Sequence, residues 1–179
     1  MTRRSFVAAA AAVALAGALA GCAAPQPADY AAEHPVLSLQ RYFNGKLEAH
    51  GMFQNRSGKV VKRFVVQMDC RWNGDEGVLD EAFTYSDGTT GRRVWTLKAL
   101  PDGRFTGTAD DVVGVAQGEQ RGNAFHWTYT LKQPVDGKVY EVQMDDWMIL
   151  VDDRVMLNRA EMSKFGITLG TVTLSFTRR

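Results

Sequence analysis

The chain contains few of the residues from which disulfide frameworks and metal sites are built. Only two cysteines and three histidines occur among its 179 residues. Because Cys22 closes an apolar leader, Cys70 has no cysteine to pair with, which excludes a disulfide framework. The histidines, His34, His50 and His126, lie far apart and do not form the close set of three or four ligands that zinc requires. We therefore expect no metal and no cofactor, and we expect Cys70 to be a core thiol.

The sequence also lacks an excess of one charge. It has 21 Lys and Arg residues against 20 Asp and Glu residues, and removing residues 1–21, which include two arginines, leaves 19 against 20. A charge this close to neutral argues against nucleic acid as a partner. No Ser or Cys stands in the Gly-x-Ser-x-Gly turn that exposes a nucleophile in hydrolases, so the sequence favours a protein that is not an enzyme.

The first 22 residues follow the plan of an exported bacterial lipoprotein. Arg3 and Arg4 precede an alanine-rich apolar run, residues 6–20, which is shorter than the roughly 20 residues of a membrane-spanning helix. The run ends in Leu19-Ala20-Gly21-Cys22, which resembles a lipobox, where the cysteine is acylated and the preceding peptide is removed. We therefore predict a signal peptide over residues 1–21 and lipidation of Cys22. The arginine pair also resembles a twin-arginine export signal, which leaves both export routes open.

Residues 22–34 predict a lipid anchor and a location in the cell. Acyl chains on Cys22 would hold the protein on a membrane through the burial of their methylene groups. Ala23 stands where an aspartate usually signals retention in the inner membrane, so we expect the periplasmic face of the outer membrane. The rest of this segment is rich in alanine and proline and has no apolar periodicity, which is typical of a flexible tether.

From Gly45 onward the sequence alternates between apolar and polar residues, as β-strands do. The clearest run extends from Val60 to Trp72, with a period of two residues. Its apolar face consists of Val60, Phe64, Val66, Met68, Cys70 and Trp72. Shorter runs repeat the pattern as far as residues 172–176, which gives roughly nine or ten strands and no long helix.

Short turn signals separate these strands. The strongest are Asn73-Gly74, Asp87-Gly88, Asp102-Gly103 and Asp136-Gly137, which can supply the positive φ angles of tight hairpins. Consecutive hairpins form an antiparallel meander, and closing that meander removes its exposed edges. We therefore predict an all-β domain over residues 35–179, closed into a barrel of about 8–10 strands. A two-sheet sandwich is the alternative architecture.

Several segments of the chain resemble a family of small bacterial lipoproteins with a domain of unknown function. They are Asp80–Phe83, Ser86–Gly88, Arg93–Trp95, Ala109–Val112, Gly122–Ala124, Asp145–Met148 and Asn158–Gly166. The resemblance extends from about Pro35 to the C-terminus and implies a lipocalin-like (calycin-type) barrel with a connection to lipids. True lipocalins have a tryptophan two residues after a glycine in their first strand. The expected first strand of this chain, Tyr42 to Phe53, lacks it, so the resemblance is one of architecture.

Two pairs of adjacent carboxylates, Asp110/Asp111 and Asp145/Asp146, are candidates for acid–base chemistry, for a metal site, or for ionic pairing with Arg92, Arg93, Arg159 or Lys164. Neighbouring residues on a strand point to opposite faces, so each pair can offer only one carboxylate to a shared interior. Residues 158–166 interrupt the alternation. We expect a short helical turn there, acting as a plug at one barrel end, as a lid, or as a segment that docks a partner.

A barrel of this size can hold one small ligand, and the chain supplies aromatic residues to line it. The candidate ligand-binding residues, placed at the barrel mouth, are Trp95, Asp110, Trp127, Asp146, Trp147 and Arg159. Our leading hypothesis is a membrane-anchored periplasmic lipoprotein that binds or carries a lipid, such as a fatty acid, or another small apolar ligand. The alternatives are an envelope interaction or structural protein with a filled barrel and, third, a carboxylate-based enzyme.

Overall fold

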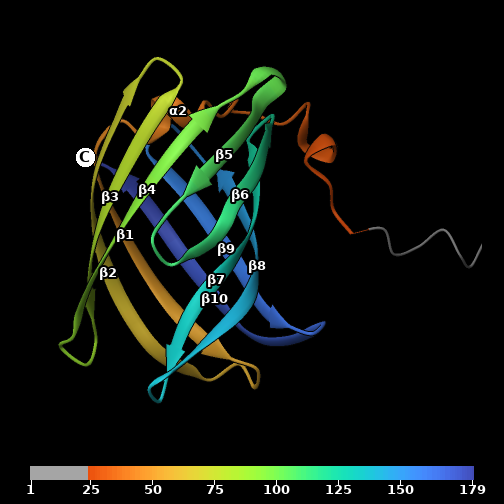
Figure 1. Ribbon diagram of the computed structural model, residues 1–179. Helices are drawn as coiled ribbons and strands as arrows, with labels where there is room; N and C mark the ends of the chain where they lie inside the picture. The colour runs from red at the N-terminus through yellow and green to blue at the C-terminus, as the bar shows by residue number, and fades with distance from the viewer. Residues whose placement is uncertain (1–23) are drawn as a thin grey trace, which may run out of the picture.

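Ten antiparallel strands follow one another along the chain, and each pairs with the next (Figure 1). The computed structural model describes residues 24–179, so the predicted signal peptide and Cys22 lie outside the described residues. The strands are β1 (Gly45–Asn55), β2 (Val60–Asn73), β3 (Glu76–Tyr85), β4 (Thr90–Ala99), β5 (Arg104–Thr108), β6 (Val112–Arg121), β7 (Ala124–Val135), β8 (Lys138–Leu150), β9 (Val155–Lys164) and β10 (Ile167–Arg178). Pairing of β1 with β10 closes the barrel, which confirms the predicted all-β meander and rules out the two-sheet sandwich.

The hairpin turns lie where glycine and aspartate occur together. Asp136 and Gly137, between β7 and β8, have φ angles of 49° and 75°, and Gly74, between β2 and β3, has a φ of 59°. Glycine adopts this left-handed conformation without a steric penalty, and aspartate tolerates it, which is why these dipeptides predict turns. One further turn joins β9 to β10 through Phe165 and Gly166, with φ angles of 52° and 74°.

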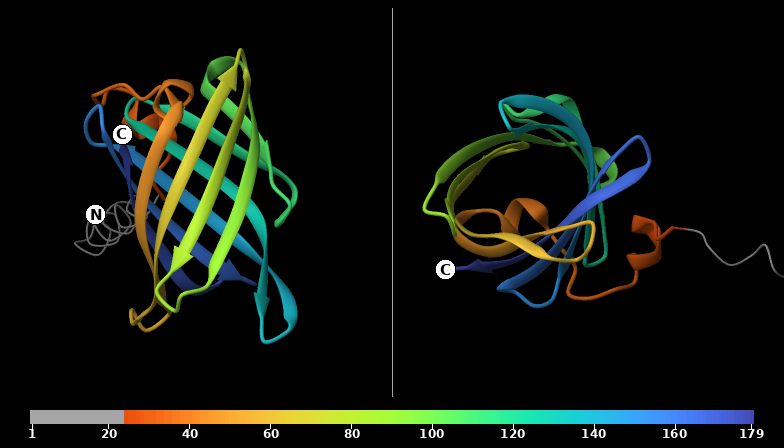
Figure 2. Two further views of the ribbon diagram at one scale, coloured as in Figure 1. Left: turned by 90° about the vertical axis from the view of Figure 1, so that its left-hand side faces the viewer. Right: turned by 90° about the horizontal axis from the view of Figure 1, so that it is seen from below.

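A short helix, α2 (Leu39–Tyr42), closes one end of the barrel, and the view along the barrel in Figure 2 shows it inside the ring of strands. Phe43, directly after the helix, is 3% exposed and is part of the buried core. Two hydrogen bonds fix the plug. The Tyr42 hydroxyl donates to the Phe176 carbonyl (3.1 Å), and the Trp72 indole N–H donates to the Phe43 carbonyl (2.9 Å). Within residues 24–179 no helix is long and apolar enough to cross a membrane.

The expected helical plug or lid at residues 158–166 is wrong, because this stretch forms most of β9 and the turn to β10. Its inward-facing residues alternate as those of any strand do, and they are Asn158, Ala160, Met162 and Lys164. Two of them are polar and one is small, so the inward face lacks the apolar signal by which a strand is recognised in sequence. The plug instead comes from the segment before β1.

Part of residues 24–34, which the sequence predicts as a flexible tether, packs against the outer wall of the barrel. The short 3₁₀-helix η1 (Pro27–Tyr30) buries Pro27, and the Tyr30 ring packs on Trp147 with 5.5 Å between ring centroids. Any side chain at Gly122 would collide with the Tyr30 carbonyl, so the close approach requires glycine there. All ten strands and the α2 plug lie within residues 24–179, which therefore contain the complete barrel.

Candidate functional site

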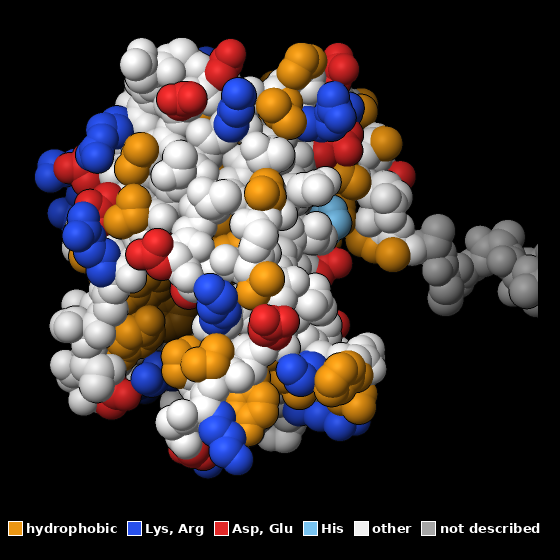
Figure 3. Space-filling model, viewed as in Figure 1, with side chains coloured by type: hydrophobic (Ala, Val, Ile, Leu, Met, Phe, Trp, Pro, Cys, Tyr) orange, Lys and Arg blue, Asp and Glu red, His pale blue; other side chains and the backbone are white. Residues whose placement is uncertain are grey.

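The interior of the barrel is hollow between the α2 plug and the opposite, open end. The cavity has a volume of about 710 Å³ and is lined by inward-facing side chains of the strands, most of them apolar or aromatic. Figure 3 shows the hollow at lower left, with hydrophobic side chains inside it. The filled interior that an interaction or structural protein was expected to have is therefore absent from this barrel.

The cavity also opens through the barrel wall. Strand β4 pairs with β5 only over residues 96–99, and β6 pairs with β7 only as far as Leu131. Toward the open end, β4 and β7 consequently have no strand between them, and we call this gap the side opening. At its inner edge the Arg93 guanidinium of β4 binds the Asp111 carboxylate of the β5–β6 turn, with 2.6 Å between the closest nitrogen and oxygen. This salt bridge ties β4 to the β5–β6 turn at the place where strand pairing stops.

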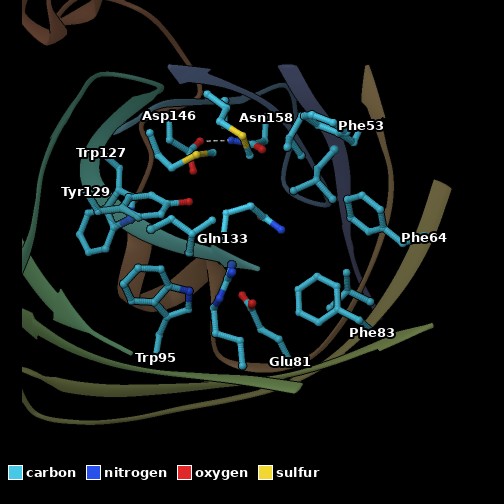
Figure 4. A pocket seen from close by; sticks show the side chains of 18 of the residues that line it. Phe53, Phe64, Glu81, Phe83, Trp95, Trp127, Tyr129, Gln133, Asp146 and Asn158 are labelled. Carbon is cyan, nitrogen blue, oxygen red and sulfur yellow. Dashed lines mark hydrogen bonds between the residues drawn. The ribbon is translucent and has the colours of Figure 1, made fainter. Parts of the chain in front are cut away.

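Aromatic side chains form two facing walls of the cavity (Figure 4). On one side, Trp95 of β4 lies edge-on to Trp127 and Tyr129 of β7, with ring centroids 5.4 and 5.3 Å away. Alternation along β7 points both of its aromatic residues inward. The opposite wall consists of Phe53, Phe64 and Phe83. Such walls offer a large apolar surface to a bound molecule.

Two glycines make room for the Trp127 indole. A Cβ atom at Gly107 of β5 would lie 2.7 Å from the Trp127 ring, and one at Gly118 of β6 would collide with the same ring. Gly118 lies directly opposite Trp127 in the β6–β7 pair, and Gly107 lies one strand further away on β5, so a larger residue at either position would displace the indole. The Trp127 ring can therefore occupy this position only because Gly107 and Gly118 have no side chain.

A ring of polar side chains crosses the cavity between these walls. This polar belt consists of Glu81, Arg93, Tyr129, Asp146 and Asn158, contributed by β3, β4, β7, β8 and β9. Glu81 and Arg93 are direct cross-strand neighbours in the β3–β4 pair. The Arg93 guanidinium lies 5.9 Å from the centroids of both Phe83 and Trp95. The guanidinium therefore contacts one aromatic ring of each wall and also lies beside carboxylates.

Across the cavity from Glu81, the belt continues with a buried amide–carboxylate pair (Figure 4). Asp146 and Asn158 are 6% and 2% exposed. The Asn158 side-chain amide donates to the Asp146 carboxylate and to the Trp147 carbonyl (3.0 Å). The Asn158 Oδ1 atom, although buried, accepts no hydrogen bond within residues 24–179. An unpaired buried acceptor is costly, so a donor that reached this oxygen would remove that cost.

Burial changes the acidity of the belt. It raises the pKa of Asp146 from 3.8 to about 7, although the hydrogen bond from Asn158 lowers it. Burial likewise raises the pKa of Glu81 from 4.5 to about 7, although the positive charge of Arg93 lowers it. The pKa of the Tyr129 hydroxyl is raised by burial and by the negative charge of Asp146. Both carboxyls can therefore change protonation state near neutral pH.

The structure places three of the six predicted ligand-binding residues on the cavity and three away from it. Trp95, Trp127 and Asp146 line the cavity. Trp147 faces outward, where it stacks on His126 with 4.3 Å between ring centroids.

Arg159 also faces outward, and its exposed side chain lies 3.9 Å from Glu161. Asp110 is exposed on the β5–β6 turn, where its neighbour Asp111 binds Arg93 instead. Trp147 and Arg159 face outward because successive side chains of a strand point to opposite faces, and the preceding residues, Asp146 and Asn158, point inward.

Sequence reasoning did not identify four members of the belt, Glu81, Arg93, Tyr129 and Asn158. A signal was present for Glu81, since it shares a face with Leu79, Phe83 and Tyr85 in a strand whose other residues are mostly polar. A charged residue in phase with apolar ones marks a polar group inside a barrel.

The described residues contain no built metal centre. Within residues 24–179 no three His, Cys, Asp or Glu side chains come close enough to hold a metal ion. Cys70, predicted as a core thiol, is 2% exposed, and burial raises its pKa to about 12. A thiol that stays protonated at neutral pH is a poor nucleophile.

Comparison with known proteins identifies a family and similar folds but shows no activity. A family model described as "Protein of unknown function (DUF3833)" matches residues 16–178. The S-type phycobiliprotein lyase CPES from Guillardia theta is similar in structure, with 8% identity and a TM-score of 0.58 over 80% of this chain and 93% of that one. A protein of unknown function from the DUF3598 family from Nostoc punctiforme is also similar, with 11% identity and a TM-score of 0.56 over 83% of this chain and 51% of that one. Among curated proteins, none has a sequence that matches.

Proposed function

This chain belongs to the DUF3833 family of proteins of unknown function, and we propose that it binds a lipid or another small, largely apolar ligand inside its barrel. The observation that carries the proposal is the cavity of about 710 Å³ between two aromatic walls. Ligand sites are typically concave, mostly apolar and roughly 300–1,000 Å³ in volume, with a few polar groups that fix orientation. Burial of apolar surface, at ~25 cal/mol per Å², supplies most of the affinity of such a site.

The polar belt supports an amphipathic ligand rather than a pure hydrocarbon. It offers the unpaired Oδ1 of Asn158 and the carboxyls of Glu81 and Asp146, while its one guanidinium is bound to Asp111. Within the belt, hydrogen-bond acceptors therefore outnumber unengaged donors, while Lys62, Gln133 and Lys164 line the cavity outside the belt. A ligand whose polar end carries O–H or N–H groups satisfies the acceptors of the belt, with its apolar part against the phenylalanine wall.

We further propose that the protein is a lipoprotein anchored through Cys22 to the periplasmic face of the outer membrane. The support is the lipobox-like Leu19–Cys22 segment and the alanine that follows it. Labelling growing cells with a radioactive fatty acid tests the anchor. The wild-type protein is expected to become labelled and Cys22→Ala to stay unlabelled. Labelling of both would show that the acyl chain is attached elsewhere, and labelling of neither would overturn the anchor.

Native mass spectrometry tests the ligand. Residues 24–179, which contain the complete barrel, are purified from the periplasm and measured before and after unfolding. We expect a stoichiometric adduct of low mass that is lost on unfolding, and its mass identifies the ligand class. A clean apo mass that stays unchanged after incubation with envelope lipid extract would overturn the proposal.

A matched pair of variants then locates the ligand. Trp127 lines the cavity, whereas Trp147 faces outward on the neighbouring strand. Trp127→Leu is expected to lower ligand occupancy several-fold, and Trp147→Leu is expected to leave it unchanged. Equal losses in both folded variants would place the ligand outside the barrel.

A second candidate function, acid–base catalysis on the bound molecule, has one observation in its favour. Glu81 and Asp146 line the same cavity, and the pKa of each is about 7, where a general acid or base works best. One structural neighbour is a lyase by name, but at 8% identity it shares the fold alone. If the ligand found by mass spectrometry is converted by wild-type protein and not by Asp146→Asn, the catalytic candidate replaces simple binding.

A further inference from the structure

The exposed hydrophobic side chains of the barrel are concentrated at its open end. We define the open rim as the four turns around the mouth with their flanking residues, 55–62, 85–90, 132–141 and 163–169. These segments contain 31 of the 156 described residues but eight of the 14 exposed large hydrophobic residues. The eight are Val60, Val61, Val135, Val139, Tyr140, Phe165, Ile167 and Leu169. Isolated surface hydrophobics are ordinary, but a concentration at one end indicates contact with something apolar.

Phe165 is the most exposed of these residues, at 91%. It occupies the β9–β10 turn with a φ of 52°, a conformation that favours glycine or asparagine and disfavours a bulky residue. Neither packing nor backbone conformation therefore accounts for a phenylalanine at this position. Its ring lies at the tip of a hairpin, where it can enter an apolar phase without any rearrangement of the barrel.

Basic side chains accompany these hydrophobic tips. The Lys164 ammonium lies 5.1 Å from the Phe165 ring centroid and 5.8 Å from that of Tyr140. The open rim contains six Lys and Arg residues against three Asp and Glu, whereas the other described residues contain 13 against 17. Figure 3 shows hydrophobic side chains among basic ones at lower right, where the β9–β10 turn lies in Figure 1. The charge of the rim is thus opposite in sign to that of the rest.

We propose that the open rim docks on the surface of an anionic phospholipid bilayer, with the Phe165 tip inserted among the headgroups and the cavity mouth facing the lipid. Apolar residues flanked by lysines are what interfacial binding requires, because the apolar groups enter the acyl boundary while the ammonium groups stay with the phosphates. The hydrophobic residues lie on separate hairpin tips and not on one continuous flat face, which favours a fluid surface over a folded protein partner.

The described chain starts on the side wall of the barrel, where the η1 segment packs near the β6–β7 turn of the plugged end. The side chains of the open rim alone therefore define the docked orientation. Docking needs no ligand, so this inference goes beyond the proposed function and stands or falls separately from it.

Vesicle co-sedimentation tests the docking. Residues 24–179 are mixed with vesicles of phosphatidylcholine alone or of phosphatidylcholine and phosphatidylglycerol in equal amounts. We expect binding to the anionic vesicles, weak binding to the neutral ones, and loss of binding at high salt, because salt screens the lysines. Phe165→Asn, which suits the left-handed turn, is expected to lower the partition coefficient by about tenfold.

Two controls keep the outcomes distinct. Leu157→Ser removes another exposed hydrophobic residue, 49% exposed, from the same hairpin but away from the rim, and it is expected to bind like wild type. Absence of binding to anionic vesicles, or an equal loss in Phe165→Asn and Leu157→Ser, would overturn the docking proposal. Ligand occupancy measured by native mass spectrometry in Phe165→Asn is expected to stay at the wild-type level, and a loss there would point to the cavity instead of the rim.

Discussion

The two ends of the barrel place their hydrophobic side chains in opposite ways. At the plugged end, Leu37, Leu39 and Phe43 are 2%, 2% and 3% exposed inside the ring of strands. At the open end, Phe165 and Val139 are 91% and 64% exposed. Between them the polar belt crosses the cavity. Apolar burial at the plugged end therefore stabilises the barrel, whereas the exposed hydrophobic residues of the open end add little to that stability.

The largest effect is expected from a large-to-small substitution in the plug. Phe43 packs edge-on against the rings of Tyr42 and Phe176, with centroids 5.3 and 5.4 Å away. Phe43→Ala leaves a cavity that the surrounding strands cannot fill and is expected to lower the free energy of unfolding by about 3–5 kcal/mol. Val139→Ala at the open rim is expected to change it by less than about 0.5 kcal/mol. Urea denaturation measures both, and similar losses would contradict the division between the two ends.

The polar belt is expected to make stability depend on pH. Because the folded-state pKa of Asp146, about 7, lies above its unfolded value of 3.8, the native state holds this proton more tightly. The free energy of unfolding therefore falls as the pH rises from about 4 to about 7 and stays low above that range. Asp146→Asn cannot ionise, so it is expected to exceed wild type by about 2–4 kcal/mol at pH 8 and to match it at pH 4.

The adjacent carboxylate is the control for this pH dependence. Asp145 points outward and lies 3.0 Å from His126. Asp145→Asn is expected to keep the wild-type fall in stability between pH 4 and pH 7. Denaturation of all three proteins across that range separates the two positions, and a flat wild-type curve would show that Asp146 ionises as it does in the unfolded chain.

The sequence predicted the barrel well because its strongest signals are local. A glycine with an aspartate or asparagine fixes a turn, and alternation over Val60–Trp72 fixes which side chains share a face. The plug did not follow from such a signal. Residues 35–44 have no periodicity long enough to indicate a helix, and α2 is stabilised by long-range bonds such as that from Tyr42 to Phe176.

The candidate site was harder to predict, because it depends on register. Glu81 faces Arg93 only once β3 and β4 are paired, and Asp146 meets Asn158 only across β8 and β9. Local alternation does state that Asp146 and Trp147 cannot share a face. The prediction that both residues line one site was therefore wrong, and alternation along the strand already excluded it. Which of the two points inward depends on the closed barrel.

A matched pair of glycine substitutions tests whether the inner half of the barrel is packed more tightly than the half near the open end. Gly118 lies beside the aromatic wall, and a Cβ there would collide with the rings of Phe125 and Trp127. Gly118→Ala is expected to cost about 1–3 kcal/mol and to shift the tryptophan fluorescence, because the indole must move. A Cβ atom at Gly91, nearer the open end, would lie 3.4 Å from the Tyr85 ring, which is an ordinary contact. Gly91→Ala is therefore expected to be neutral or to stabilise by up to about 1 kcal/mol. Equal costs would contradict the tighter packing of the inner half.

The smallest effect is expected at the tip of the open rim, and its sign matters more than its size. Phe165 has a φ of 52° and is 91% exposed, so it pays a backbone penalty without gaining burial. Phe165→Asn is expected to stabilise the barrel by a few tenths of a kcal/mol to about 1 kcal/mol, since asparagine tolerates this conformation. Phe165→Leu keeps the penalty and is expected to match wild type in urea denaturation. If Phe165→Asn is instead destabilising, the phenylalanine contributes to the fold itself, and the open rim can no longer be treated as a region whose hydrophobic residues serve only contact with a partner.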